Sequence, residues 1–231
     1  MKTTMLLLSC IIFIHAYSQK PLFDQRAGNL RLAVDGSGKI TALVNITDGT
    51  NYIAPDGAIY LLECQKYGAD DSKPMLQPES MRIIRQTKTD AKIELSYKEG
   101  VKLTVLITPQ KDYFRLELTD AFPVTDISQI VWGPYKTTMR GQIGEWLGLI
   151  RSKNFTIGLL SMEPHTDGIA ASYISGGSSL QLYAYDNTRE RFVSTKNEKL
   201  RRAVPVPGLT VKGSAVALFG CPTGKSNELG V

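Results

Sequence analysis

Short runs of apolar residues, each bounded by turn-forming residues, recur along almost the whole chain. In Leu30–Val34 apolar and polar side chains alternate, Asp35 to Gly38 follows as a turn, and a second apolar run covers 40–46. Alternation with a period of two is typical of a strand with one buried face, and a glycine-containing turn between two such runs predicts a β-hairpin. Similar runs, each expected to be a strand, are 59–64, 81–86, 92–97, 101–108, 113–118, 146–150, 155–161, 180–185 and 209–219.

About ten strands with little helical periodicity predict an all-β fold, an antiparallel β-sandwich or a barrel, because each sheet must cover its apolar face with another sheet. The stretch 188–202 is rich in Arg and Lys, and we interpret it as a solvated loop rather than a phosphate site. No repeat of fixed period and no low-complexity linker divides the chain. We therefore expect one β-sandwich domain over 19–221, followed over 222–231 by a tail or the start of a linker.

The first eighteen residues have the pattern of a secretory signal peptide. Lys2 precedes an apolar run over 5–14, and small residues occupy positions 16 and 18, so we expect cleavage before Gln19 and a secreted or periplasmic protein. The run is too short to span a membrane, and no later one is long enough. The alternative, lipoprotein anchoring through Cys10, is disfavoured because the apolar stretch continues beyond it.

Composition and charge exclude some classes of function. The 231 residues carry a net charge of +5 that is spread along the chain, which gives little support for nucleic-acid binding. Without Cys10, two cysteines remain, Cys64 and Cys221, and these either form a disulfide or are two buried thiols. Neither has a Cys or His neighbour at the spacing of a zinc site, and no motif implies a cofactor, so we expect neither metal nor cofactor.

Three segments carry a resemblance to a known family. The opening 30–53, which contains Ile-Thr-Ala-Leu and Asp-Gly-Thr-Asn-Tyr, looks like the start of a galactose-mutarotase-like supersandwich domain. The stretch 112–120 and the later Trp-Gly-Pro-Tyr of 132–135 are similar to segments of secreted glycoside hydrolase-like proteins of Bacteroidetes, in which such a sandwich precedes a catalytic barrel. The resemblance implies a supersandwich fold, a carbohydrate partner and a C-terminal catalytic domain. It supplies no catalytic motif that this chain matches.

Residue types that bind saccharides are concentrated between 132 and 167. Aromatic rings cover the apolar face of a sugar, while carboxylates and guanidinium groups bond its hydroxyls. Trp146 opens an apolar run and has the alternative interpretation of a core residue, as does Trp132 beside Gly133 and Pro134. The ligand-binding candidates are Trp132, Tyr135, Arg140, Glu145 and Trp146.

The densest polar cluster is Glu163, His165 and Asp167. On a strand these three would share one side, where they could transfer a proton. Pro164 and Gly168 equally favour a turn, in which Asp is frequent for backbone reasons. The expected function is therefore a secreted, non-catalytic N-terminal β-sandwich module of a carbohydrate-active enzyme. The alternatives are a free-standing glycan-binding protein and a sugar-modifying enzyme that uses these three side chains.

Overall fold

A computed structural model describes residues 20–55, 58–67, 75–144, 148–168, 171–189, 191–194, 200–203 and 205–225. The expected signal peptide, Cys10 and most of the expected C-terminal tail lie outside this part of the chain. Within it, the only helical elements are three single-turn 3₁₀ helices, Lys98–Gly100, Val124–Asp126 and Thr223–Lys225, and no helix is long and apolar enough to cross a membrane.

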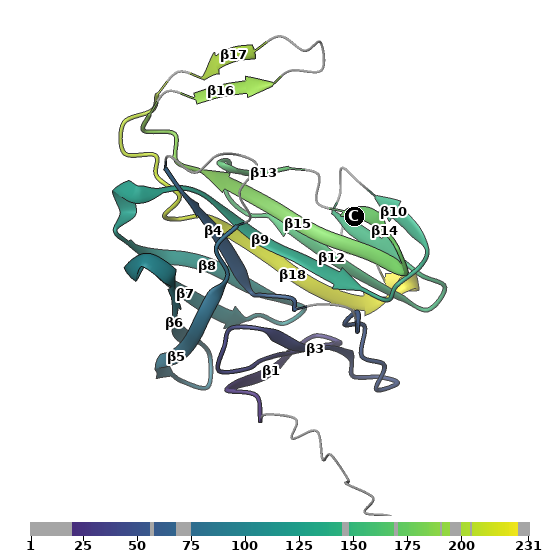
Figure 1. Cartoon of the computed structure of the whole chain (residues 1–231). Helices are drawn as coiled ribbons and strands as arrows, with labels where there is room; N and C mark the ends of the chain where they lie inside the picture. Colours follow the sequence, from purple (N-terminus) through teal and green to yellow (C-terminus); the bar gives the residue numbers. More distant parts are fainter. Residues whose placement is uncertain are drawn as a thin grey trace, which may run out of the picture.

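The regular structure is antiparallel β-sheet throughout (Figure 1). One sheet has eight strands, β5 (Pro78–Gln86), β6 (Ala91–Tyr97), β7 (Lys102–Pro109), β8 (Tyr113–Phe122), β10 (Gln142–Gly144), β11 (Leu149–Arg151), β12 (Phe155–Ser161) and β18 (Ala215–Pro222). Their spatial order is β10-β11-β12-β18-β8-β7-β6-β5. The last strand of the described chain therefore lies inside this sheet, between β12 and β8.

Two smaller sheets pack against the large one. A five-stranded sheet contains β4 (Leu62–Lys66), β9 (Ile127–Thr137), β13 (Thr166–Asp167), β14 (Ala171–Ile174) and β15 (Gly177–Tyr185). A three-stranded sheet contains β1 (Phe23–Ala27), β2 (Leu30–Val34) and β3 (Ile40–Asn45). Buried apolar side chains from all three sheets form one cluster, which confirms the predicted all-β antiparallel sandwich.

Most of the expected runs are strands, whereas β1, β9, β10, β13 and β14 lie outside every expected run. The run 59–64 becomes a strand only from Leu62, because Ile59 and Leu61 instead bond residues 38–40 beside β3. The run 209–219 becomes a strand only from Ala215, since turns fill the residues before it. The charged stretch interpreted as a loop contains a hairpin, β16 (Arg191–Ser194) with β17 (Leu200–Ala203).

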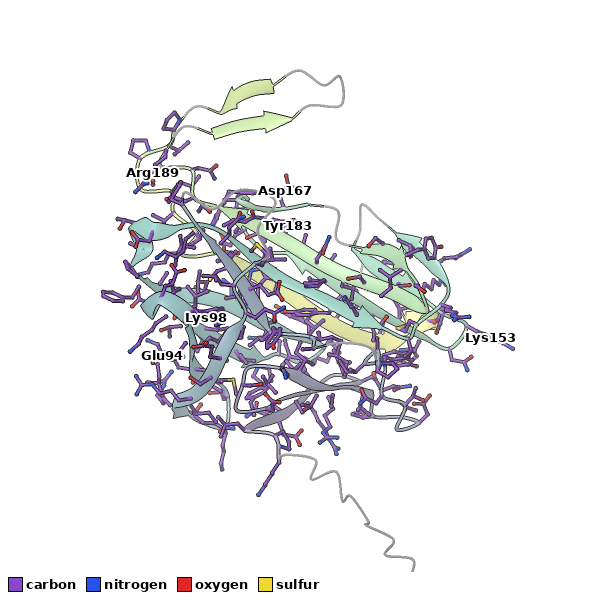
Figure 2. The ribbon with its side chains drawn as sticks, viewed as in Figure 1. Glu94, Lys98, Lys153, Asp167, Tyr183 and Arg189 are labelled. Carbon is purple, nitrogen blue, oxygen red and sulfur yellow. The ribbon has the colours of Figure 1, made fainter. Side chains whose placement is uncertain are left out.

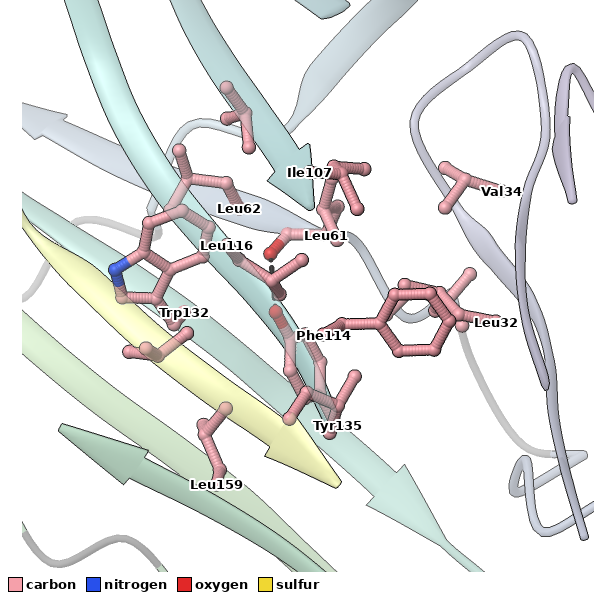
Figure 3. Packing of buried hydrophobic residues seen from close by; sticks show 14 of the residues in the cluster. Leu32, Val34, Leu61, Leu62, Ile107, Phe114, Leu116, Trp132, Tyr135 and Leu159 are labelled. Atoms are coloured by element: carbon pink, nitrogen blue, oxygen red, sulfur yellow. Dashed lines mark hydrogen bonds between the residues drawn. The ribbon is translucent and has the colours of Figure 1, made fainter. Parts of the chain in front are cut away.

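The core contains large side chains with no exposed surface, among them Phe114, Trp132 and Tyr135 (Figure 3). Burial of each such side chain contributes about 1.5–3 kcal/mol relative to exposure. The Tyr135 hydroxyl donates to the Leu61 carbonyl at 2.7 Å, and the Tyr97 hydroxyl on β6 donates to the Leu62 carbonyl at 2.9 Å. Tyrosines from the eight-stranded and the five-stranded sheets therefore fix the start of β4.

A buried hydrogen-bonded group joins β9, β13 and the turn before β18. The Trp132 indole N–H donates to Ser214 Oγ at 2.8 Å, and the Thr166 and Ser214 hydroxyls are 2.8 Å apart. All three side chains are buried. Because buried polar groups are costly without partners, this group fixes how the end of the sandwich closes.

The two cysteines do not form a disulfide, so the alternative of two buried thiols is the one observed. Cys64 lies in the main core, and Cys221 lies in a small cluster with Leu149 and Phe219. Burial raises the pKa of the Cys64 thiol to about 12, so this thiol stays protonated at neutral pH.

Candidate functional site

The outer face of the eight-stranded sheet, the face turned away from the core, carries an unusual apolar area on β8, β12 and β18. Along β18, Val216 and Leu218 belong to the core cluster, so the alternate residue Phe219 faces outward. The Phe219 ring lies over Gly158 of β12, where a Cβ atom would come within 2.2 Å of the ring. Tyr113 of β8 lies directly opposite Phe219 in the strand register. The pair therefore lies on the outer face of the sheet, with Tyr113 partly exposed and Phe219 itself buried, 3% exposed, in a small cluster with Leu149 and Cys221.

A cavity of about 350 Å³ opens over this pair. Its volume is at the low end of the roughly 300–1,000 Å³ typical of small-molecule sites. Apolar atoms make up most of the floor, and polar groups are contributed by Asp112 and Ser161. The lining residues are Asp112, Tyr113, Leu160, Ser161, Met162, Ala217 and Phe219.

A charged group adjoins the cavity. Arg115 donates from Nε to Glu117 Oε2 at 3.1 Å, and its Nη2 lies 3.5 Å from Glu163 Oε1. Its Nη1 donates to the sulfur of Met162, a lining residue, at 3.7 Å. The three charged side chains are about one-third exposed. One guanidinium group therefore orients two carboxylates beside the aromatic floor, and one of them, Glu163, is a residue that the sequence identified.

The structure does not bring Glu163, His165 and Asp167 into one site. The Thr166 N–H donates to the Glu163 carbonyl at 3.0 Å, so the segment forms a turn. Glu163 reaches Arg115 on the eight-stranded sheet, whereas Asp167 is exposed on β13, opposite Tyr183 of the five-stranded sheet (Figure 2). His165 Nε2 is buried without a hydrogen-bond partner in the described residues. The turn interpretation holds, and this arrangement offers no shared proton-transfer site for the three groups.

The ligand-binding candidates between 132 and 146 are placed differently from the expectation. Trp132 and Tyr135 have no exposed surface and bond inward, so neither ring is available to cover a sugar. Arg140 is exposed shortly after β9 and does not line the cavity. Glu145 and Trp146 lie outside the described residues.

Sequence reasoning missed the cavity-lining residues Asp112, Tyr113 and Phe219. The first two lie in the stretch used for the family resemblance, but nothing local marks them as ligand contacts. Phe219 was interpreted only as part of the last strand. The useful signal was the outward position of these aromatic residues in alternating strands, which requires the strand register to interpret.

In the described part of the chain, no group of three or more His, Cys, Asp or Glu side chains lies close enough together to hold a metal ion. No protein-family model and no curated protein matches this chain. The class that the fold itself defines is an all-β antiparallel sandwich with an aromatic-floored cavity on one outer face.

Proposed function

We propose that this protein is a secreted carbohydrate-binding module, the non-catalytic N-terminal β-sandwich of a glycoside hydrolase-like enzyme. The observation that carries the proposal is the cavity over Tyr113 and Phe219 with its polar rim. The signal-peptide pattern and the resemblance to galactose-mutarotase-like domains support the setting. The catalytic carboxylates then belong to a further domain, which this module positions or supplies with substrate.

The lining suits the two chemical sides of a sugar ring. The C–H face of a pyranose packs on apolar and aromatic surface such as Tyr113 and Leu160. Its hydroxyls bond the carboxylate of Asp112 and the hydroxyl oxygen of Ser161, which donates its own proton to the Glu163 carbonyl at 2.8 Å and so acts as an acceptor. Hydrogen bonds to ionised groups are about twice as strong as neutral ones, so the carboxylates contribute most of the orientation. The pair held by Arg115 extends this polar rim beside the cavity.

The direct test is binding of the chain starting at Gln19 to a panel of soluble oligo- and polysaccharides, measured by calorimetry and affinity electrophoresis. We expect Tyr113→Ala to weaken binding at least about tenfold, equivalent to about 1.4 kcal/mol. Asp112→Asn should weaken it less, because the amide keeps one acceptor. Tyr173→Ala is the matched control, since Tyr173 is an exposed aromatic residue outside the cavity.

Circular dichroism must show that each variant folds. Saturable binding that Tyr113→Ala weakens and Tyr173→Ala leaves intact supports the proposal. A flat titration across the whole panel, or equal loss in both variants, overturns it. A free-standing glycan-binding protein would use the same cavity. The intact mass of the native secreted product separates these two settings, because a module is part of a larger chain.

A further inference from the structure

A second cavity, of about 550 Å³, lies at the start of the edge strand β5, beside the turn between β2 and β3 and the residue that follows β6. It shares no residue with the cavity over Tyr113 and Phe219. Segments from four parts of the chain form its walls. The lining residues are Ser37, Lys39, Tyr60, Met75, Leu76, Gln77, Pro78, Glu79 and Lys98.

One wall is a turn that several bonds hold rigid. Asp35 Oδ1 accepts hydrogen bonds from the backbone N–H groups of Ser37 at 2.8 Å and Lys39 at 3.1 Å. The Met81 N–H on β5 donates to the Gly36 carbonyl at 2.7 Å, which ties the turn to the eight-stranded sheet. Gly38 has a φ of +81° and packs so closely on β5 and β6 that a Cβ atom would clash. The backbone that carries Ser37 and Lys39 is therefore fixed in place.

Two further lining residues, Tyr60 and Lys98, are also anchored. Lys98 directly follows Tyr97, whose buried hydroxyl bonds the Leu62 carbonyl. Tyr60 pairs with Lys39 in an isolated β-bridge, and the Lys39 ammonium lies 5.7 Å from the centre of the Tyr60 ring. Cation–π contact of this kind steadies a lysine without neutralising its charge.

The charges of this cavity are unbalanced. Among the described residues, neither Lys39 nor Lys98 has a carboxylate partner, whereas nearby Lys66 pairs with Glu99 at 3.0 Å. Glu79 is the single carboxylate among the lining residues. Two lysines against one carboxylate leave the described lining with a net positive charge, which favours an anion.

We propose that this second cavity binds the anionic group of an acidic sugar, a uronate carboxylate or a sulfate ester. The choice of a sugar rests on the proposed carbohydrate binding, while the choice of an anion rests on Lys39 and Lys98. Tyr60 supplies an aromatic surface for the neutral part of the sugar, and Gln77, whose Nε2 donates to Glu63 at 3.2 Å, supplies its amide oxygen as an acceptor. The protein then holds an acidic saccharide at a site separate from the cavity over Tyr113.

The experiment measures binding of three probes to the chain starting at Gln19, namely tetragalacturonate, a sulfated dextran oligomer and neutral galactotetraose. The combined variant Lys39→Gln, Lys98→Gln should lose about tenfold in affinity for an anionic probe at low salt, and added salt should remove the difference. Glu79→Gln should strengthen the same binding, since it removes the like charge. Lys153→Gln is the control, because this exposed lysine lies at the far end of the molecule from Lys98 (Figure 2).

Binding of tetragalacturonate alone assigns a carboxylate, binding of the sulfated probe alone assigns a sulfate, and binding of both assigns either anion. Failure of both anionic probes, or equal losses in the paired variant and Lys153→Gln, overturns the inference. Tyr113→Ala separates it from the proposed function. If Tyr113→Ala changes no saccharide binding while the lysine variants do, the anion site stands and the first cavity does not.

Discussion

Replacing Ser214 by alanine tests how the end of the sandwich is held closed. Ser214 is fully buried, and its hydroxyl bonds both the Trp132 indole N–H and the Thr166 hydroxyl at 2.8 Å. Alanine leaves both partners buried and unsatisfied. Each unsatisfied group costs about 1–3 kcal/mol, so we expect Ser214→Ala to lower the free energy of unfolding by about 2–6 kcal/mol. For a domain of this size that corresponds to a fall in Tm of roughly 4–24 °C.

The chain offers a matched control at Ser179. This serine is also buried, but its hydroxyl has no hydrogen-bond partner in the described residues. Ser179→Ala removes an unsatisfied group rather than creating one, and we expect it to leave stability unchanged or slightly raised. A general sensitivity of buried serines to truncation would instead destabilise both variants.

The assay is equilibrium unfolding in urea, followed by circular dichroism, for both variants and for Ser214→Ala in a Trp132→Phe background. In that background the indole N–H is absent, so Ser214→Ala should cost at least about 1 kcal/mol less than in the natural chain. A Ser214→Ala variant within about 0.5 kcal/mol of the natural protein would refute the reasoning. So would a cost that is the same in both backgrounds.

Three further predictions follow from burial and packing. In the chain starting at Gln19, Cys64 and Cys221 should not react with a thiol reagent until the protein unfolds, and two thiols per chain should then react. Rapid reaction of the native protein would contradict their burial. Burial raises the pKa of Glu63, so the folded state favours the protonated carboxyl and its ionisation costs stability. Glu63→Gln should therefore raise the Tm at pH 7, and the gain in Tm should shrink as the pH falls to about 4.5. A gain in Tm that does not depend on pH would count against this. Gly158→Ala should displace the Phe219 ring, lower the free energy of unfolding by about 1–3 kcal/mol and weaken saccharide binding. Unaltered stability and affinity would show that the ring does not pack on Gly158 as described.

Local patterning predicted the strands whose alternation is uninterrupted. The strand Phe155–Ser161 has the predicted limits because turn-forming residues bound a mostly apolar run. Strand β9 was not predicted, since Gly133 and Pro134 interrupt its pattern. In the folded chain a shift in register between Leu180 and Leu182 on β15 accommodates this break. Between the pairs made by these two residues β9 advances three residues and β15 only two, so the extra residue, a β-bulge, lies in β9 at Gly133 and Pro134.

The site was harder to predict than the strands because it depends on the pairing of segments that are distant in sequence. Tyr113 and Phe219 are distant in sequence and become neighbours only because β18 pairs with β8. Glu163 was identified from its local cluster, but the turn that follows separates it from Asp167. Conversely, Trp132 attracted attention as an aromatic residue and is a core side chain, since composition alone does not distinguish the two faces of a strand.

The position of β18 inside the eight-stranded sheet has a consequence for the order of folding during synthesis. Strands β5–β8 and β10–β12 are complete before residues 215–222 leave the ribosome, yet β18 is the strand that joins them. Pairing between distant segments is slow because loop closure precedes any stabilising contact. Until β18 is synthesised, the two halves of the large sheet therefore have unpaired strand edges at β8 and β12. The aromatic floor of the cavity forms in that same step, because Phe219 arrives with it.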